Sequence, residues 1–507
     1  MTIEEQRYKL QLAVDSSKSQ KQRNEKGQFS TPFNLACDIV NYAISLLPST
    51  EKLSVLEPAC GMGVFFSALQ NNPNCNDISG SIGFEIDPDY QKPSAGLWSQ
   101  FGVDIRCADF LLQKPDRKFP LLISNPPYTR HHYLPTDIKH VLQNAVKEQT
   151  GLNISGLAGL YCYFMILSNK WLEDGGISCW LVPSEFMDVN YGDAVRRFLL
   201  EKVDLLRIHR FDENSLQFKD ALVSSSVVFF RNTPPTDKPV EFTFSGNISK
   251  PLKVKFIDRQ TLSNTKKWNP LFKETNVDNN SDFELKIGDF FEVKRGIATG
   301  CNQFFIVDAN TVERYDIPKE FLTPILPRPK KVQGNIIKSM DGLPVLDEKL
   351  FLFSSNEGFD IIRQKYSGVA QYLSEGLKKK VNEGYICSRH DPWYSCEKRR
   401  PAPFVIPYMG RHTSEKQMFR FILNESDAIA TNGYLMMYPR KEYAYLLKDK
   451  KILHDVWQQL NNIPMQAFER QGRTYGGGLH KIEPKELLNL PAGNIAKLLG
   501  NHIPWVA

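Results

Sequence analysis

One short motif carries the clearest chemistry in this sequence, Asn125-Pro126-Pro127-Tyr128 at the end of an apolar run. Two consecutive prolines end a strand and fix the backbone, so the Asn125 side-chain oxygen and the Pro126 carbonyl become neighbouring acceptors. Tyr128 adds a flat aromatic face. Two acceptors beside a stacking ring are what a flipped-out base with an exocyclic amine requires. The alternative, for the motif alone, is a proline-rich turn.

Three further groups follow strand-like runs earlier in the chain. The segment 57–63 reads EPACGMG, and its glycines would let a ligand approach the backbone. It lacks the GxGxxG spacing of a dinucleotide site, and Glu57 suits a cationic or amine-bearing ligand instead. Glu85 is placed to accept both hydroxyls of a ribose. Asp109 suits an adenine amino group, and Phe110 would cover the ring. Each group alone is also explained by an ordinary turn.

Alternating strand and helix patterns must position these groups. Such alternation predicts an α/β fold with a mainly parallel sheet covered on both faces. Ligands of such sheets bind outside the carboxyl ends of the strands, which is where all four groups fall. Residues 1–24 are expected to form a helix or a mobile arm. The expected strands are 54–58, 81–87, 103–109, 121–127, 176–183, 205–211 and 224–230, and the expected helices are 34–47, 64–70, 156–172 and 191–200.

The alternation of strand and helix patterns ends after residue 232, and the turn-rich stretch 233–239 is a candidate domain boundary. Residues 1–250 hold 25 Lys and Arg against 28 Asp and Glu, a net charge of −3. Residues 251–507 hold 38 against 29, a net charge of +9. A basic half beside a neutral one favours a polyanion such as nucleic acid. Solvated lysines on a large surface explain the charge equally well.

The order of these motifs resembles a known family. KGQFSTP at 26–32, then VLEPACGMG, GFEID, ADF and NPPY, resemble the gamma-type adenine-specific DNA methyltransferases of type II restriction–modification systems. TaqI, PstI and BsuBI modification methylases are members. The resemblance covers residues 26–232. It continues more faintly at 295–302 and 475–481, which look like the opening and closing segments of such enzymes' target recognition domain.

The resemblance implies a fold and a division of the chain. The fold is the S-adenosylmethionine-dependent methyltransferase fold with a mixed seven-stranded sheet, followed by a mixed α+β target recognition domain. The division is an N-terminal arm at 1–25, a catalytic domain that binds S-adenosylmethionine at 26–240 and a DNA target recognition domain at 241–507. The implied activity is methyl transfer from S-adenosylmethionine to N6 of a flipped-out adenine in duplex DNA.

The resemblance also implies roles for individual residues. Cofactor contacts are expected from Thr31, Glu57, Ala59, Cys60, Gly61, Gly63, Glu85, Asp109 and Phe110, with Thr31 and Glu57 at the methionine end. Asn125 and the Pro126 carbonyl would bind the target amine, Pro127 completes their motif, and Tyr128 would stack on the target base. Phe218 matches the aromatic residue that packs against the flipped adenine, with Phe211 as a competing candidate. No metal is expected.

Basic runs in the second half are candidate DNA contacts. They would touch phosphates, and such contacts position a protein without specifying bases. For each run the alternative is a solvated face. The candidates are Arg328, Lys330, Lys331, Lys398, Arg399 and Arg400, together with Lys378 to Lys380.

Remaining expectations concern partners and location. Because no run of 18 apolar residues occurs and the first residues are polar, we expect a cytoplasmic protein. Nine cysteines without a CxxC pair predict reduced thiols. The resemblance implies a monomer that acts on double-stranded DNA and pairs functionally with a restriction endonuclease. The alternatives are an RNA or protein-glutamine N-methyltransferase, a fused restriction–modification enzyme, or a DNA-binding protein with a catalytically dead methyltransferase fold.

Overall fold

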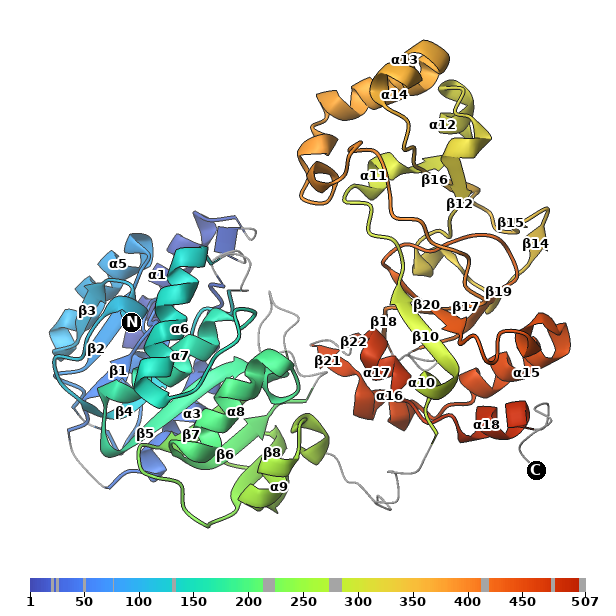
Figure 1. Ribbon diagram of the computed structural model, residues 1–507. Coiled ribbons are helices and arrows are strands. Elements are labelled where there is room, and N and C mark those ends of the chain that lie inside the picture. Colours follow the sequence, from blue (N-terminus) through green and yellow to red (C-terminus); the bar gives the residue numbers. More distant parts are fainter. Residues whose placement is uncertain are drawn as a thin grey trace. The chain divides into compact units, whose positions relative to one another are not determined.

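The computed structural model describes residues 1–19, 22–23, 27–48, 52–75, 77–129, 134–212, 224–272, 285–411, 419–475 and 479–500. The chain forms two compact units (Figure 1). The first holds the described residues up to 272 together with Tyr475, and the second holds the other described residues from 285 onward. Within the described ranges, no helix has the length and apolarity needed to cross a membrane. All nine cysteines are free thiols, and five of them are buried.

A nine-stranded mixed sheet forms the centre of the first unit, in the order β3-β2-β1-β4-β5-β7-β6-β8-β9. The strands from β3 to β5 run parallel, and β7 runs antiparallel to both of its neighbours. The strands are β1 (Val55–Glu57), β2 (Ile82–Glu85), β3 (Asp104–Cys107), β4 (Phe119–Ser124), β5 (Leu172–Pro183), β6 (Asp204–Arg210), β7 (Ser225–Arg231), β8 (Val240–Gly246) and β9 (Pro251–Ile257).

The predicted fold class is therefore confirmed, and each of the seven expected strands is present. The sheet has nine strands rather than seven, because β8 pairs with β6 and β9 pairs with β8. The turn-rich stretch 233–239 connects two strands of one sheet, so the first unit continues beyond the boundary expected at 240. Val240 and Phe242 of β8 are buried in the same apolar core as the earlier strands, which explains why this part of the chain stays with the sheet.

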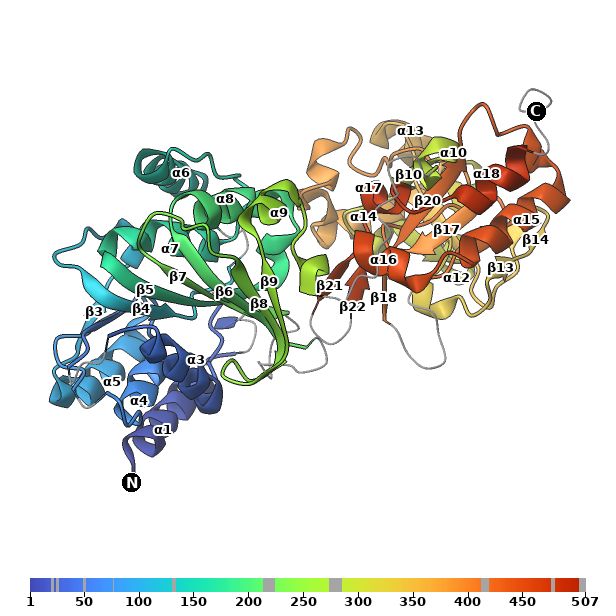
Figure 2. The ribbon, with the colours of Figure 1, turned by 90° about the horizontal axis from the view of Figure 1, so that it is seen from below.

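Helices cover both faces of this sheet, with α1, α3, α4 and α5 on one face and α6, α7 and α8 on the other (Figure 2). Helix α7 is shorter than the expected 156–172, because its last turn is a 3-10 helix and β5 begins at Leu172. The helices are α1 (Ile3–Ser16), α3 (Phe33–Ser45), α4 (Val64–Gln70), α5 (Pro88–Trp98), α6 (Thr136–Thr150), α7 (Leu160–Leu167), α8 (Asp193–Glu201) and α9 (Arg259–Asn264).

The segment expected as an N-terminal arm is an integral part of the first unit. Thr2 and Glu5 form a reciprocal capping box that starts α1. The helix then packs against α4 and α5. Its anchors are hydrogen bonds from Ser67 to Glu4 (2.7 Å) and from Tyr90 to Asp15 (2.6 Å). Helix α1 is therefore packed into the first unit and is not a separate arm.

The second unit is a mixed α+β structure with several small sheets, as predicted. A five-stranded sheet in the order β10-β20-β17-β19-β13 separates two apolar clusters, and smaller sheets surround it. The strands of the whole second unit are β10 (Phe291–Arg295), β11 (Ile306–Asp308), β12 (Leu322–Pro324), β13 (Ile336–Ile337), β14 (Ser339–Met340), β15 (Leu343–Pro344), β16 (Leu350–Phe353), β17 (Phe404–Pro407), β18 (Met409–Arg411), β19 (Ile422–Asn424), β20 (Tyr434–Pro439), β21 (Arg473–Tyr475) and β22 (Leu479–Lys481). Its helices are α10 (Ile287–Phe290), α11 (Asn302–Phe305), α12 (Ala309–Arg314), α13 (Phe359–Lys365), α14 (Ser367–Lys378), α15 (Lys450–Asn461), α16 (Met465–Gln471), α17 (Pro484–Leu488) and α18 (Gly493–Gly500).

Candidate active site

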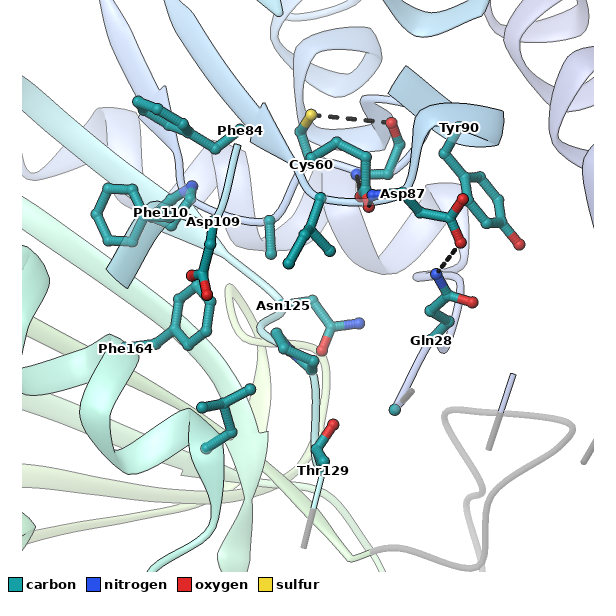
Figure 3. A pocket seen from close by; sticks show the side chains of 18 of the residues that line it. Gln28, Cys60, Phe84, Asp87, Tyr90, Asp109, Phe110, Asn125, Thr129 and Phe164 are labelled. Atoms are coloured by element: carbon teal, nitrogen blue, oxygen red, sulfur yellow. Dashed lines mark hydrogen bonds between the residues drawn. The ribbon is translucent and has the colours of Figure 1, made fainter. Parts of the chain in front are cut away.

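A cavity of about 550 Å³ lies at the carboxyl ends of the first four strands (Figure 3). Leu56 of β1 pairs with Ile82 of β2 and with Leu122 of β4, so these strands end at the same edge. The volume falls within the range of roughly 300–1,000 Å³ that is usual for small-molecule sites. The predicted site residues that line it are Thr31, Glu57, Ala59, Cys60, Gly61, Glu85, Asp109, Phe110, Asn125 and Pro127.

The side-chain amide of Asn125 has a fixed orientation. Its nitrogen donates to the Phe29 carbonyl oxygen and to the Thr31 hydroxyl oxygen, each at 3.0 Å. Because a carbonyl oxygen can only accept, the amide cannot be reversed without losing that bond. The opposite atom, Oδ1, is buried and has no partner among the described residues. A buried acceptor without a donor is the arrangement expected where a ligand supplies the missing N–H.

The two glycines of the turn after β1 have different roles in the structure. Both have positive φ, +51° at Gly61 and +78° at Gly63, a region that favours glycine. A Cβ on Gly61, which lines the cavity, would meet no atom within 4 Å, so this position leaves space for a ligand. A Cβ on Gly63 would lie 2.3 Å from the Trp98 indole nitrogen. Gly63 therefore permits helix packing, and it is not among the residues that line the cavity.

Two buried carboxylates, Glu57 and Glu85, are the last residues of β1 and β2. Glu57 is 1% exposed, and its Oε2 has no partner among the described residues. Burial raises the pKa of Glu57 well above its ordinary value, Arg7 partly offsets this, and Glu85 adds to it. Glu85 accepts from the Gly61 N–H at 2.9 Å and the Asp87 N–H at 2.8 Å. Burial raises the pKa of Glu85, and these N–H groups oppose the increase.

Asp109 and Phe110 occupy the side of the cavity after β3. The Asp109 carboxylate accepts from the Leu111 N–H at 3.0 Å, and burial raises its pKa. Phe110 is 3% exposed and stacks on Phe164 with ring centroids 5.8 Å apart and planes at 19°. Figure 3 shows Asp109, Phe110 and Phe164 on one side of Asn125, with Gln28 and Asp87 on the other. The two sides differ in character, one aromatic and one polar.

Several predicted residues do not line the cavity. Pro126 is buried beside it, and the Tyr128 hydroxyl donates to the Leu181 carbonyl at 3.2 Å. The Tyr128 ring packs against Phe29 with centroids 5.8 Å apart. Phe211 is 5% exposed and belongs to the apolar core beneath the sheet. Phe218 lies outside the described residues.

Sequence reasoning missed the contribution of three helices to the cavity lining. Arg7 and Gln11 of α1 line the cavity, as do Ile138 and Leu142 of α6 and Phe164 of α7. A single buried arginine gives no distinctive pattern in one sequence. The one available signal was the capping box at Thr2, which marks the start of a stable helix where a helix or a mobile arm was expected.

The basic candidates lie on the surface of the second unit. Arg328, Lys330, Lys331, Lys398 and Arg400 are exposed. Lys331 pairs with Glu348, and the Arg400 guanidinium lies 4.9 Å from the centre of the Tyr438 ring. Arg399 is half-buried and pairs with Glu397 at 2.8 Å. The neighbouring Tyr394 is 1% exposed, so this aromatic belongs to the core of the unit.

Two family models match separate parts of the chain. Residues 67–218 match the Eco57I restriction-modification methylase model, and residues 274–503 match the C-terminal domain of the type II methyltransferase M.Eco57I. The type II methyltransferase M.AccI of Acinetobacter calcoaceticus is 26% identical over 94% of this chain and 87% of its own length. M.XamI of Xanthomonas campestris pv. amaranthicola is 27% identical over 74% of this chain and 68% of its own length.

A solved complex of the type IIL restriction-modification enzyme MmeI with DNA is 11% identical, with a TM-score of 0.49, over 80% of this chain and 59% of that chain. The sequence matches extend over both structural units, since the M.AccI alignment includes 504 residues. The two models and these relatives together make both units of the chain similar to type II restriction–modification methyltransferases.

Proposed function

We propose that this chain is a site-specific DNA adenine methyltransferase that acts on N6 of a flipped-out adenine and protects DNA from a cognate restriction endonuclease. The observation that carries the proposal is the buried, unpartnered Oδ1 of Asn125 at the edge of the cavity. A fixed acceptor at this position fits an exocyclic amine. Similarity to these methyltransferases supports methyl transfer as the reaction class.

The cavity has the donor and acceptor groups that S-adenosylmethionine needs. Glu57 has an unpartnered buried oxygen that would accept from an ammonium group, and Glu85, which lines the same cavity, would accept from the ribose hydroxyls. Asp109 and Phe110 would hold the adenine ring, and the open space at Gly61 admits the ligand close to the backbone. When bound, S-adenosylmethionine supplies an electrophilic methyl group on a positively charged sulfur.

The chain's own part in the reaction is to hold the amine and stabilise its developing charge. The adenine amine is a weak nucleophile because its lone pair is delocalised into the ring. Hydrogen bonds from the amine to Asn125 Oδ1 and the Pro126 carbonyl favour a pyramidal nitrogen with a localised lone pair. Positive charge builds on that nitrogen in the transition state, so fixed acceptors there stabilise the transition state more than the ground state.

The second unit would recognise the DNA. Its exposed Arg328, Lys330, Lys398 and Arg400 fit phosphate contacts, and the excess of basic residues after position 250 supports a polyanionic partner. Tyr128 would stack on the target base, with Phe218 as a second aromatic contact. The recognised base sequence would be read by other side chains of this unit.

The test is a methylation reaction offered three substrates together. Purified protein receives labelled S-adenosylmethionine, unmethylated duplex DNA, total RNA and a protein extract, and each polymer is then separated and hydrolysed. We expect the label in DNA as N6-methyladenine, and its loss in Asn125→Ala. Label in RNA or in protein glutamine would overturn the choice of substrate. If the protein binds S-adenosylmethionine but transfers no methyl group to any polymer, the result would support a DNA-binding protein with a catalytically dead methyltransferase fold.

A further inference from the structure

Arg7 of α1 contributes a positive charge to the cavity. It is 3% exposed, and its Nε and Nη2 both donate to the Glu4 carboxylate at 2.7 Å. This pairing leaves the two N–H groups of Nη1 for a further acceptor, and no described residue accepts from them. Arginine is a common partner for carboxylates because its planar donors match their geometry.

The position of Arg7 is well fixed. Glu4, which holds its guanidinium, also accepts from the Ser67 hydroxyl of α4 at 2.7 Å. Farther along α1, Asp15 accepts from Tyr90 of α5. A guanidinium held in this way loses little side-chain freedom when it binds a ligand, which favours affinity.

The charges around the cavity are unequal. Among the described residues that line it, Glu57, Glu85, Asp87 and Asp109 are acidic and Arg7 is the one basic side chain. Arg7 acts electrostatically on Glu57, the carboxylate with an unpartnered oxygen. One cation and one anion near each other in a buried site match the two charges of an amino acid, whose ammonium and carboxylate share one carbon.

We infer that Arg7 binds the carboxylate of the amino-acid end of S-adenosylmethionine, while Glu57 binds its ammonium group. This inference rests on the proposed function. It assigns a cofactor contact to a helix outside the segment 26–232 that carries the family resemblance. It also gives α1 a role in ligand selection, because a ligand without the carboxylate gains nothing from Arg7.

The experiment compares two ligands by equilibrium titration with the full chain. S-adenosylmethionine carries both charges, whereas decarboxylated S-adenosylmethionine keeps the ammonium and the sulfonium and lacks the carboxylate. Arg7→Met removes the charge and keeps a long apolar side chain. We expect Arg7→Met to weaken S-adenosylmethionine binding by roughly tenfold or more, and binding of the decarboxylated ligand by less than about twofold.

Two further variants separate binding from helix anchoring. Arg7→Lys keeps the charge but lacks the planar guanidinium. Its affinity for S-adenosylmethionine should therefore fall between the affinities of the wild type and Arg7→Met. Glu4→Gln weakens the anchor and keeps the guanidinium. It should therefore change the affinities for both ligands by similar, small factors. Thermal unfolding of every variant reports whether the fold is intact.

The outcomes are distinguishable. Equal losses for both ligands in Arg7→Met, reproduced by Glu4→Gln, would show that Arg7 only anchors α1 and would overturn the inference while leaving the proposed function intact. A wild-type chain that binds neither ligand would overturn the proposed function, and the inference with it. A selective loss for the ligand with the carboxylate supports both.

Discussion

Glu57 in the first unit and Glu483 in the second are both largely buried, but their surroundings differ. Glu57 has an unpartnered oxygen, and burial raises its pKa well above the ordinary value. Burial would also raise the pKa of Glu483, yet hydrogen bonds from Tyr408, Arg295 and Lys481 outweigh it and lower the pKa to about 2. Side chains of the protein donate hydrogen bonds to the Glu483 carboxylate, whereas one oxygen of Glu57 receives none from the described residues.

This difference distinguishes a carboxylate with a structural role from the carboxylate that we propose binds a ligand. The Glu483 cluster joins Arg295 of β10 to Lys481 of β22 and Tyr408 between β17 and β18, so it holds parts of the second unit together. Glu57 holds nothing comparable, and its burial is unfavourable without a ligand. Unsatisfied buried polar groups are rare in folded proteins. Glu57 and Asn125 each have one such atom at the same cavity, which supports the binding site proposed there.

The largest expected effect is a loss of methyl-transfer rate on replacement of Asn125. Asn125→Ala removes the fixed acceptor, and we expect the single-turnover rate of methyl transfer to fall by about 100-fold or more. S-adenosylmethionine affinity should change little, because the lost oxygen is assigned to the target amine. Rapid-quench assays at saturating S-adenosylmethionine measure the rate. A rate within a few fold of the wild type would exclude the assigned role.

The next largest effects, on stability and on ligand binding, are expected at the two glycines of the β1–α4 turn, Gly61 and Gly63. Gly63→Ala should lower the free energy of unfolding by about 1–3 kcal/mol, because the new Cβ meets Trp98 in a positive-φ position. Gly61→Ala should destabilise less and should weaken S-adenosylmethionine binding, because its Cβ points into open space at the cavity. Chemical denaturation and ligand titration of both variants test this. Equal stability losses would contradict the different packing of these positions.

The two carboxylates should respond to neutralisation in opposite ways. Glu483→Gln should lower the free energy of unfolding by about 1–2 kcal/mol near neutral pH, since it weakens several hydrogen bonds in a partly solvated site. Glu57→Gln should leave the ligand-free protein as stable as the wild type or slightly more stable, because it removes a buried ionisable group that lacks a full set of partners. Urea denaturation at about pH 7 measures both.

The pH dependence sharpens this prediction. The folded-state pKa of Glu483 is lowered, so its stabilisation is present above its ordinary pKa and is lost as the pH falls toward about 2. The folded-state pKa of Glu57 is raised, so the wild type loses stability relative to Glu57→Gln as the pH rises through it. Difference curves with the same slope for both variants would contradict the contrast.

The smallest effect concerns a single surface charge. Lys330 is exposed, and Lys330→Ala should leave stability unchanged. If Lys330 contacts a phosphate, the slope of the logarithm of DNA affinity against the logarithm of salt concentration should fall by about one. Fluorescence anisotropy over a salt series measures the slope. Lys202, an exposed lysine of the first unit, provides a matched control whose replacement should not alter the slope.

Sequence patterns predicted seven of the nine strands of the first unit, and they predicted the cavity residues at the strand ends because parallel strands bring their carboxyl ends to one edge. Glu57, Glu85, Asp109 and Asn125 were predictable for that reason. A helix was one of two alternatives expected at 1–24, but the burial of its Arg7 was not predictable, since Arg7 is held by a local pair with Glu4. The end of the first unit was also missed, because a proline-rich turn inside a sheet resembles a linker.

The proposed function requires a ligand whose ammonium group is held by Glu57 in the cavity of the first unit. Calorimetric titration of S-adenosylhomocysteine, which keeps the ammonium group, into the wild type and Glu57→Gln tests this requirement most directly. We expect one binding site in the wild type and a clearly weaker affinity in Glu57→Gln, because the amide offers no negative charge to the ammonium group. Absence of binding, or equal affinity in both proteins, would contradict the proposed role of Glu57.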